Sequence, residues 1–112
     1  EAMDKKFYHM AGVLPGRAYR TPRLNRFGYV TLIQNHSVLG CETLGEIPAH
    51  EFHYFDSDNC GESYTARKPL SSRSWNCIHS DRQGMSGFPH MYYYSNLQVP
   101  EQFLRTCEER KA

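Results

Sequence analysis

Residues 50–55 read HEFHYF, and this segment constrains the fold more than any other part of the chain. Aromatic side chains favour extended backbone, in which successive residues point to opposite faces of a strand. Strand geometry therefore predicts that His50 and His53 lie on opposite faces. The same geometry predicts that Glu51 and His53, two positions apart, share one face.

The two histidines of this segment invite comparison with zinc motifs, but their spacing argues against a metal site. The HExxH motif needs a helix and a separation of four residues, whereas HEFH has a separation of three and favours a strand. A zinc site here would need further ligands from His79 or His90. We therefore expect no metal site. Glu51 and His53 remain either an acid–base pair or a hydrogen-bonded pair on a strand surface.

Four other segments are predicted to be extended. FGYVTLIQ is rich in β-branched and aromatic residues, and SYTARK is expected to form a hairpin with the HEFHYF strand. WNCIHS is a further short strand. FPHMYYYS is aromatic and extended, with Pro89 restricted to a sheet edge or a strand start. In chain order these segments are residues 27–34, 63–68, 75–80 and 88–95.

One helix is predicted, over residues 100–110, with Pro100 in its first turn. Val99, Phe103, Leu104 and Cys107 follow helical spacing and form its expected apolar face. The predicted fold class is α+β or α/β, with four or five short strands in a mixed sheet and a C-terminal helix.

Composition excludes several classes of protein. The chain has 112 residues, with 13 Lys and Arg against 12 Asp and Glu, so its net charge of +1 argues against a nucleic-acid partner. No apolar run approaches the roughly 20 residues of a membrane span, and the N-terminal EAMDKKFYHM lacks a signal-peptide core. We expect a cytoplasmic piece of a longer protein. The arginines of residues 17–26 are expected on a solvated face, or alternatively in contact with a carboxylate.

The four cysteines, Cys41, Cys60, Cys77 and Cys107, form no CxxC pair and are too sparse for a disulfide framework. We expect reduced thiols. Cys60, in SDNCGES, comes nearest to the setting of a nucleophile, but its acidic neighbours disfavour the thiolate.

Four stretches taken together resemble a known family. MAGVLPGRAYRTPRLNRFGYVTL, AHEFHYFDS, RSWNCIH and GFPHMYYYSN occur in the order found in the glutamine amidotransferase domain of cobyrinate a,c-diamide synthases, which are class I amidotransferases of corrin biosynthesis. The resemblance covers nearly the whole chain, and its most specific segments are HEFHY and FGY. Ala49 stands where the family usually has a glycine.

The resemblance implies that residues 1–112 are the C-terminal part of that domain. The family's nucleophilic cysteine and its ATP-binding synthetase domain would then lie outside this chain. The piece itself would hold no cofactor, while the parent enzyme would use ATP and Mg²⁺ to amidate cobyrinate with ammonia from glutamine. Hydrogenobyrinate or another tetrapyrrole is an alternative substrate, and an exposed sheet edge could support a homodimer.

The resemblance also selects a catalytic residue. The family's general-base histidine lies on the late strand before the terminal helix, where GFPHMYYYSN places His90. Two departures from the family pattern are Pro89 before it and Tyr92 where a second histidine is common. Glu51 and His53 would have a supporting role. The competing hypothesis is a non-catalytic module that binds a tetrapyrrole or a protein through its arginines and tyrosines.

Overall fold

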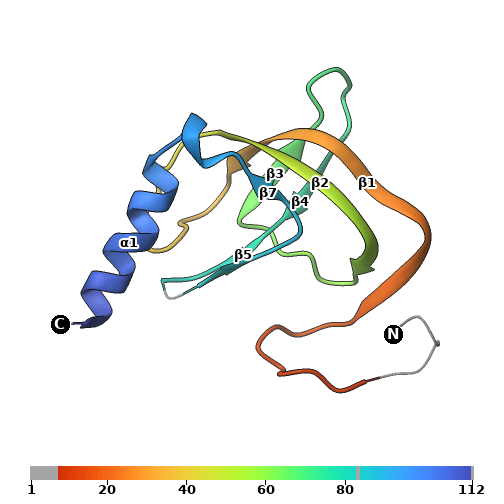
Figure 1. Cartoon of the computed structure of the whole chain (residues 1–112), viewed down its shortest axis with the longest axis horizontal. Coiled ribbons are helices and arrows are strands. Elements are labelled where there is room, and N and C mark those ends of the chain that lie inside the picture. The colour runs from red at the N-terminus through yellow and green to blue at the C-terminus, as the bar shows by residue number, and fades with distance from the viewer. Residues whose placement is uncertain (1–7, 83, 112) are drawn as a thin grey trace.

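The computed structural model describes residues 8–82 and 84–111 (Figure 1). Most of the N-terminal stretch in which no signal-peptide core was predicted therefore lies outside the described residues. Along the chain the elements are β1 (Ala18–Gln34), β2 (Ile47–Ser57), β3 (Tyr64–Arg67), β4 (Ser74–Cys77), β5 (His79–Ser80), β6 (Met85–Ser86), β7 (His90–Met91), the 3-10 turn η1 (Tyr93–Ser95) and α1 (Gln98–Lys111).

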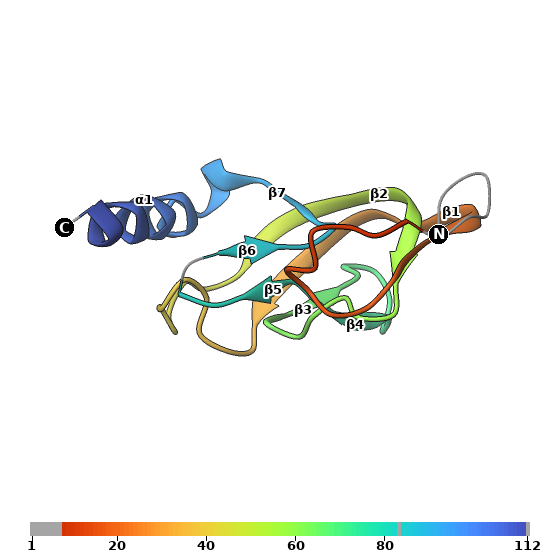
Figure 2. The same cartoon turned by 90° about the horizontal axis from the view of Figure 1, so that it is seen from below.

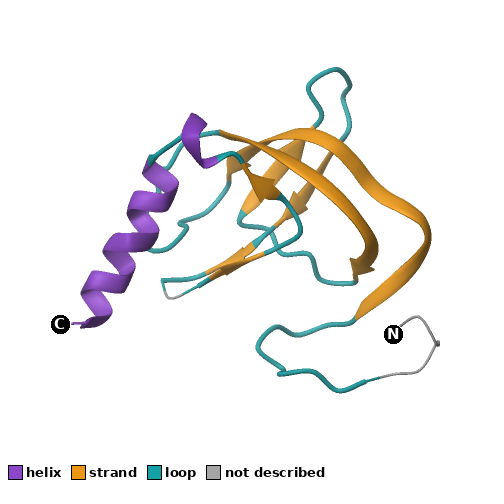
Figure 3. Cartoon of the chain, viewed as in Figure 1, coloured by secondary structure: helices purple, strands orange, loops and turns teal. Residues whose placement is uncertain are grey.

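Five strands form the main sheet, in the order β4-β3-β1-β2-β7, and β5 pairs with β6 in a separate two-stranded sheet. Every pairing between these strands is antiparallel, so the predicted mixed sheet is wrong. Loops connect consecutive strands, whereas parallel pairing needs a long crossover such as a helix. The prediction of uniformly short strands is also wrong, because β1 has 17 residues and β2 has 11. Figure 3 shows the curled sheet with one long helix beside it.

The partner predicted for residues 63–68 is wrong. β3 pairs with the end of β1, where Thr31 lies opposite Arg67, and β1 itself pairs with β2. The loop after β2 thus carries the chain to the other edge of β1. The second edge of β2 is occupied at Ala49 and His50 by β7.

β1 begins nine residues before the predicted strand and includes most of the arginine-rich segment. Its first half continues because β2 supplies backbone partners as far as Ala18, opposite Ser57. Arg17, Arg20 and Arg23 are exposed, which confirms the solvated face expected for these three.

The late strands are shorter than predicted. Ile78 has a left-handed φ of 69° and separates β4 from β5, so residues 75–80 are not one strand. In residues 88–95 only His90–Met91 is a strand, and η1 follows it. Pro89 directly precedes β7 at the edge of the sheet, as predicted.

The terminal helix is confirmed, and so is the burial of Val99, but the rest of its predicted apolar face (Phe103, Leu104 and Cys107) is exposed. Val99 and Thr106 are buried, whereas Phe103 and Leu104 are exposed. Gln102 Nε2 donates to the Leu39 carbonyl oxygen at 2.8 Å, and Thr106 Oγ1 donates to the same oxygen at 3.4 Å. Polar bonds to this loop carbonyl therefore orient the helix. Figure 2 shows α1 at one end of a flat molecule, and within the described residues no helix is long and apolar enough to cross a membrane.

Tyr64 is a fully buried residue of the hydrophobic core. Burial raises the pKa of Tyr64 to about 12, with the thiols of Cys41 and Cys77 adding to the effect. Its hydroxyl has no hydrogen-bond partner among the described residues. Such an oxygen loses its hydration on folding without compensation.

Tyr64→Phe is expected to increase the free energy of unfolding by about 1 kcal/mol, because it removes an uncompensated buried hydroxyl. The wild-type pKa is higher in the folded state than its ordinary value of 10, so the native state holds this proton more tightly. The contribution of this proton to the free energy of unfolding is therefore fully present below pH 10 and is lost as the pH rises toward 12. Denaturant unfolding at pH 8 and pH 11 checks this: the phenylalanine variant should lose less stability between the two pH values than the wild type does.

Candidate functional site

Strand alternation in β2 holds as predicted. The Glu51 side chain is 1 % exposed and that of His53 is 9 % exposed, so both lie on the inner side of the strand. Phe52 and Tyr54 point the other way and are about half exposed. The two histidines of HEFHYF therefore lie on opposite faces, and the segment does not converge on one ion. Within the described part of the chain, no group of three His, Cys, Asp or Glu side chains could hold a metal ion.

Glu51 and His53 form a buried hydrogen-bonded pair. His53 Nε2 lies 3.2 Å from Glu51 Oε1, and His53 Nδ1 bonds to the carbonyl oxygen of Phe55. The carbonyl only accepts, so Nδ1 must carry a hydrogen. The structure shows the hydrogen bond between Glu51 and His53, but it lies in the interior and not on a strand surface as predicted.

A third side chain completes this inner cluster. The ring of Phe88 stacks on the imidazole of His53, with centroids 4.2 Å apart and planes 10° from parallel. Phe88 lies two residues before His90, in the segment that leads into β7. This contact could not be predicted from the sequence, because nothing in the local pattern relates residues 53 and 88.

His90 lies on the other face of the sheet. β7 places it directly opposite His50, and directly opposed residues of an antiparallel pair share a face. The His90 side chain is exposed. The structure thus brings Glu51 and His53 together but separates them from His90. Among the described residues, no carboxylate forms an ion pair with His90.

Aromatic rings surround His50 on this outer face. Phe27 and Tyr29 of β1 make edge-to-face contacts with its imidazole, at centroid distances of 6.1 and 5.4 Å. Phe27 also contacts Phe52 at 5.7 Å. The outer face of the β1–β2 pair is therefore apolar and accessible beside His90.

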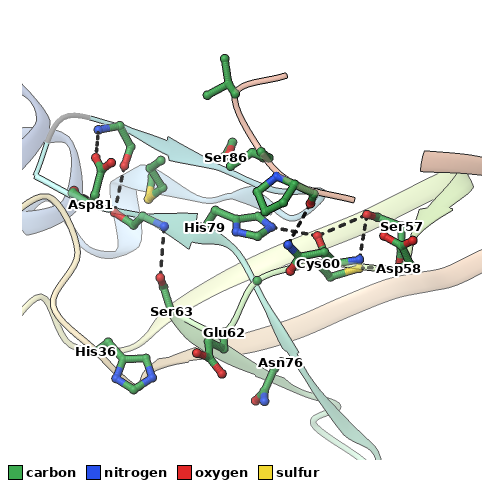
Figure 4. A pocket seen from close by; sticks show the side chains of 18 of the residues that line it. His36, Ser57, Asp58, Cys60, Glu62, Ser63, Asn76, His79, Asp81 and Ser86 are labelled. Atoms are coloured by element: carbon green, nitrogen blue, oxygen red, sulfur yellow. Dashed lines mark hydrogen bonds between the residues drawn. The ribbon is translucent and has the colours of Figure 1, made fainter. Parts of the chain in front are cut away.

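A separate open cleft of about 1210 Å³ is lined by the N-terminal segment, the loop after β1, the loop after β2 and residues 76–81 and 84–86 of the β4–β6 region (Figure 4). Asp58 and Asn59 fasten the N-terminal segment to the loop after β2: Asp58 Oδ1 accepts from the Arg17 amide at 2.7 Å, and Asn59 Nδ2 donates to the Pro15 carbonyl oxygen at 2.9 Å. None of the three predicted site residues lines the cleft. No sequence motif marks it, because its walls come from four separate segments.

The cysteines form no disulfides. Cys60 lines the cleft, and its thiol donates to Asp56 Oδ1 at 3.4 Å, an acceptor that disfavours a thiolate. Cys77 is in the core, and Cys107 is exposed on α1. Cys41 lies in the loop after β1, in an isolated bridge with Val38. No cysteine lies on β2 or β7, the strands that carry His50 and His90.

The described residues thus form an antiparallel α+β domain that presents the His90 imidazole on the edge strand β7. No protein-family model matches the chain, and no solved structure matches it. Its curated relatives are named cobyrinate a,c-diamide synthase. That of Caldanaerobacter subterraneus is 32 % identical over 104 residues, which cover 89 % of this chain and 23 % of the relative. That of Picrophilus torridus is 27 % identical over 108 residues, covering 94 % and 22 %.

A third relative of the same name, from Dehalococcoides mccartyi, is 26 % identical over 114 residues, covering 96 % of this chain and 24 % of the relative. The chain is thus related to the cobyrinate a,c-diamide synthases, and the resemblance seen in the sequence is confirmed. It spans about a quarter of the length of the curated relatives it matches.

Proposed function

We propose that the chain is the C-terminal part of the glutamine amidotransferase domain of an enzyme that amidates the a and c side-chain carboxylates of cobyrinate. The observation that carries this proposal is the similarity to cobyrinate a,c-diamide synthases over 89–97 % of the chain. In this proposal a synthetase domain outside this chain would hold ATP and Mg²⁺, and the ATP would supply the phosphoryl group that converts the carboxylate into an acyl phosphate. The amidotransferase domain supplies ammonia from glutamine.

His90 is the general base of glutamine hydrolysis in this proposal. Its exposed imidazole takes the proton of a cysteine thiol, and the thiolate attacks the side-chain carbonyl of glutamine. The imidazolium then returns that proton to the departing ammonia, leaving a glutamyl thioester that water hydrolyses. The exposure of His90 supports the role, because a thiol from another part of the enzyme can reach it.

The thiol comes from outside this chain. The four cysteines lie in the core, in the cleft, in the loop after β1 and on the helix, and none lies on β7, which carries His90, or on β2 beside it. We therefore expect no glutamine hydrolysis by this chain alone. The apolar outer face around His50 suits contact with the rest of the domain, because burying exposed aromatic rings is favourable.

The test is an amidation assay of the full-length enzyme with ATP, Mg²⁺, glutamine and cobyrinate, read by mass spectrometry. The proposal predicts formation of the diamide with glutamine and also with ammonium chloride. A parallel assay with hydrogenobyrinate shows which of the two corrinoids the enzyme amidates. Absence of amidation of either corrinoid from both nitrogen sources, in a correctly folded enzyme, would contradict the proposal.

A further inference from the structure

We infer that His53 is a positioning residue for His90: Glu51 fixes the His53 ring, and that ring supports Phe88 and so the edge strand β7. This inference rests on the proposed function of His90 and deepens it. The two residues lie on opposite faces of the sheet, so His53 acts through the backbone and not by contact.

The His53 ring is fixed by its hydrogen bonds. Both ring nitrogens have a polar partner: Nδ1 bonds to the Phe55 carbonyl oxygen, and Nε2 lies 3.2 Å from Glu51 Oε1. Turning the ring over would replace these nitrogens by carbon atoms and leave the buried Glu51 carboxyl without this contact, which is costly in the interior. The plane of the imidazole is therefore determined by β2 alone.

That fixed plane is the surface on which Phe88 rests. A 10° angle between the ring planes and a 4.2 Å centroid distance define a face-to-face contact, so the position of Phe88 follows the plane of His53. Phe88 precedes Pro89, whose fixed φ angle limits the freedom of the link to His90.

β7 needs such support because it is only two residues long. Its backbone is held at the edge of β2, and the Tyr92 amide donates to the Pro48 carbonyl oxygen at 2.9 Å. Met91 packs against the core on the inner side. Phe88 and Met91 thus hold β7 against the inner side of the sheet, through His53 and the core respectively. His90 lies between them and is exposed on the outer face.

Amide hydrogen exchange of this chain, followed by NMR, tests the inference. Phe88→Leu keeps an apolar side chain but removes the ring stack, and it should accelerate exchange of the Tyr92 amide about tenfold. The Lys68 amide, which bonds to Arg73 in the β3–β4 hairpin, is the internal reference and should not change. Phe88→Tyr retains the stack and should restore protection at Tyr92.

Tyr29→Leu is the matched control, because it removes an aromatic contact with β2 on the opposite face. It should leave exchange at Tyr92 unchanged. The ¹⁵N signals of His53 provide a second readout, because the bond to the Phe55 carbonyl oxygen predicts a hydrogen on Nδ1. Unchanged exchange at Tyr92 in Phe88→Leu, or equal acceleration at Lys68, would overturn the inference.

The full-length enzyme separates positioning from mere stability. Phe88→Leu should lower kcat for glutamine about tenfold with KM unchanged, whereas Phe88→Tyr should restore it. An unchanged kcat would overturn the positioning role. Failure of the proposed function would instead appear as retained glutamine use in a variant that lacks the His90 imidazole, so the two failures are distinguishable.

Discussion

Replacing His90 with alanine is expected to lower glutamine-dependent amidation by the full-length enzyme about 10²- to 10⁴-fold, the usual contribution of a general base. Amidation with ammonium chloride should proceed at the wild-type rate, because external ammonia bypasses the thiol and the imidazole. His90 is exposed on an edge strand, so its removal leaves the buried core intact. Assays with each nitrogen source at saturating ATP measure both activities.

His50→Ala is the control for this substitution. His50 lies directly opposite His90 on the same face of the sheet, so the two histidines occupy neighbouring positions on one surface. The variant should retain glutamine use to within a few-fold, which would show that the effect belongs to one imidazole. Equal losses in both variants would indicate damage to the surface between β2 and β7 instead of loss of a base.

Gly61→Ala is expected to destabilise the chain by about 3 kcal/mol or more, or to prevent folding. Gly61 has a φ of 86°, a conformation that L-residues adopt only with strain. An added Cβ would also lie 2.4 Å from the Ile78 carbonyl oxygen and 2.7 Å from the His79 backbone nitrogen. The Ser63 amide donates to that same carbonyl oxygen, so moving it away breaks a second contact.

Gly12→Ala separates the two causes of this effect. Gly12 has a similar φ of 74°, but a Cβ there would meet nothing within 4 Å. It should cost only the backbone strain, about 1 kcal/mol. Denaturant unfolding of both variants gives the comparison, and equal losses of stability would show that the close approach to Ile78 contributes nothing.

Local patterns in the sequence predicted the parts of the fold that depend on local geometry. Alternation in HEFHYF placed Glu51 and His53 on one face of a strand, and the structure confirms it. The terminal helix is present at Gln98–Lys111, close to the predicted range. The face of that helix could not be derived, because Gln102 and Thr106 bond to a loop carbonyl more than sixty residues away.

The pairing of distant strands could not be predicted either, because it also depends on contacts between residues far apart in the chain. A nearest-neighbour hairpin of residues 63–68 with β2 was reasonable, but β3 pairs with β1. The contact of Phe88 with His53 likewise depends on the position of β7 at the edge of β2. The role of His90 follows from family resemblance alone, and it remains a prediction until it is measured.

The most direct measurement of the central claim is an isotope competition in a single reaction. The full-length enzyme receives cobyrinate, ATP, glutamine labelled with ¹⁵N in its side-chain amide, and unlabelled ammonium chloride, and the product is analysed by mass spectrometry. The wild-type enzyme should incorporate ¹⁵N, whereas His90→Ala should yield diamide containing only ¹⁴N. Substantial ¹⁵N in the product of the His90→Ala enzyme would contradict the assignment of His90 as the base that releases ammonia from glutamine.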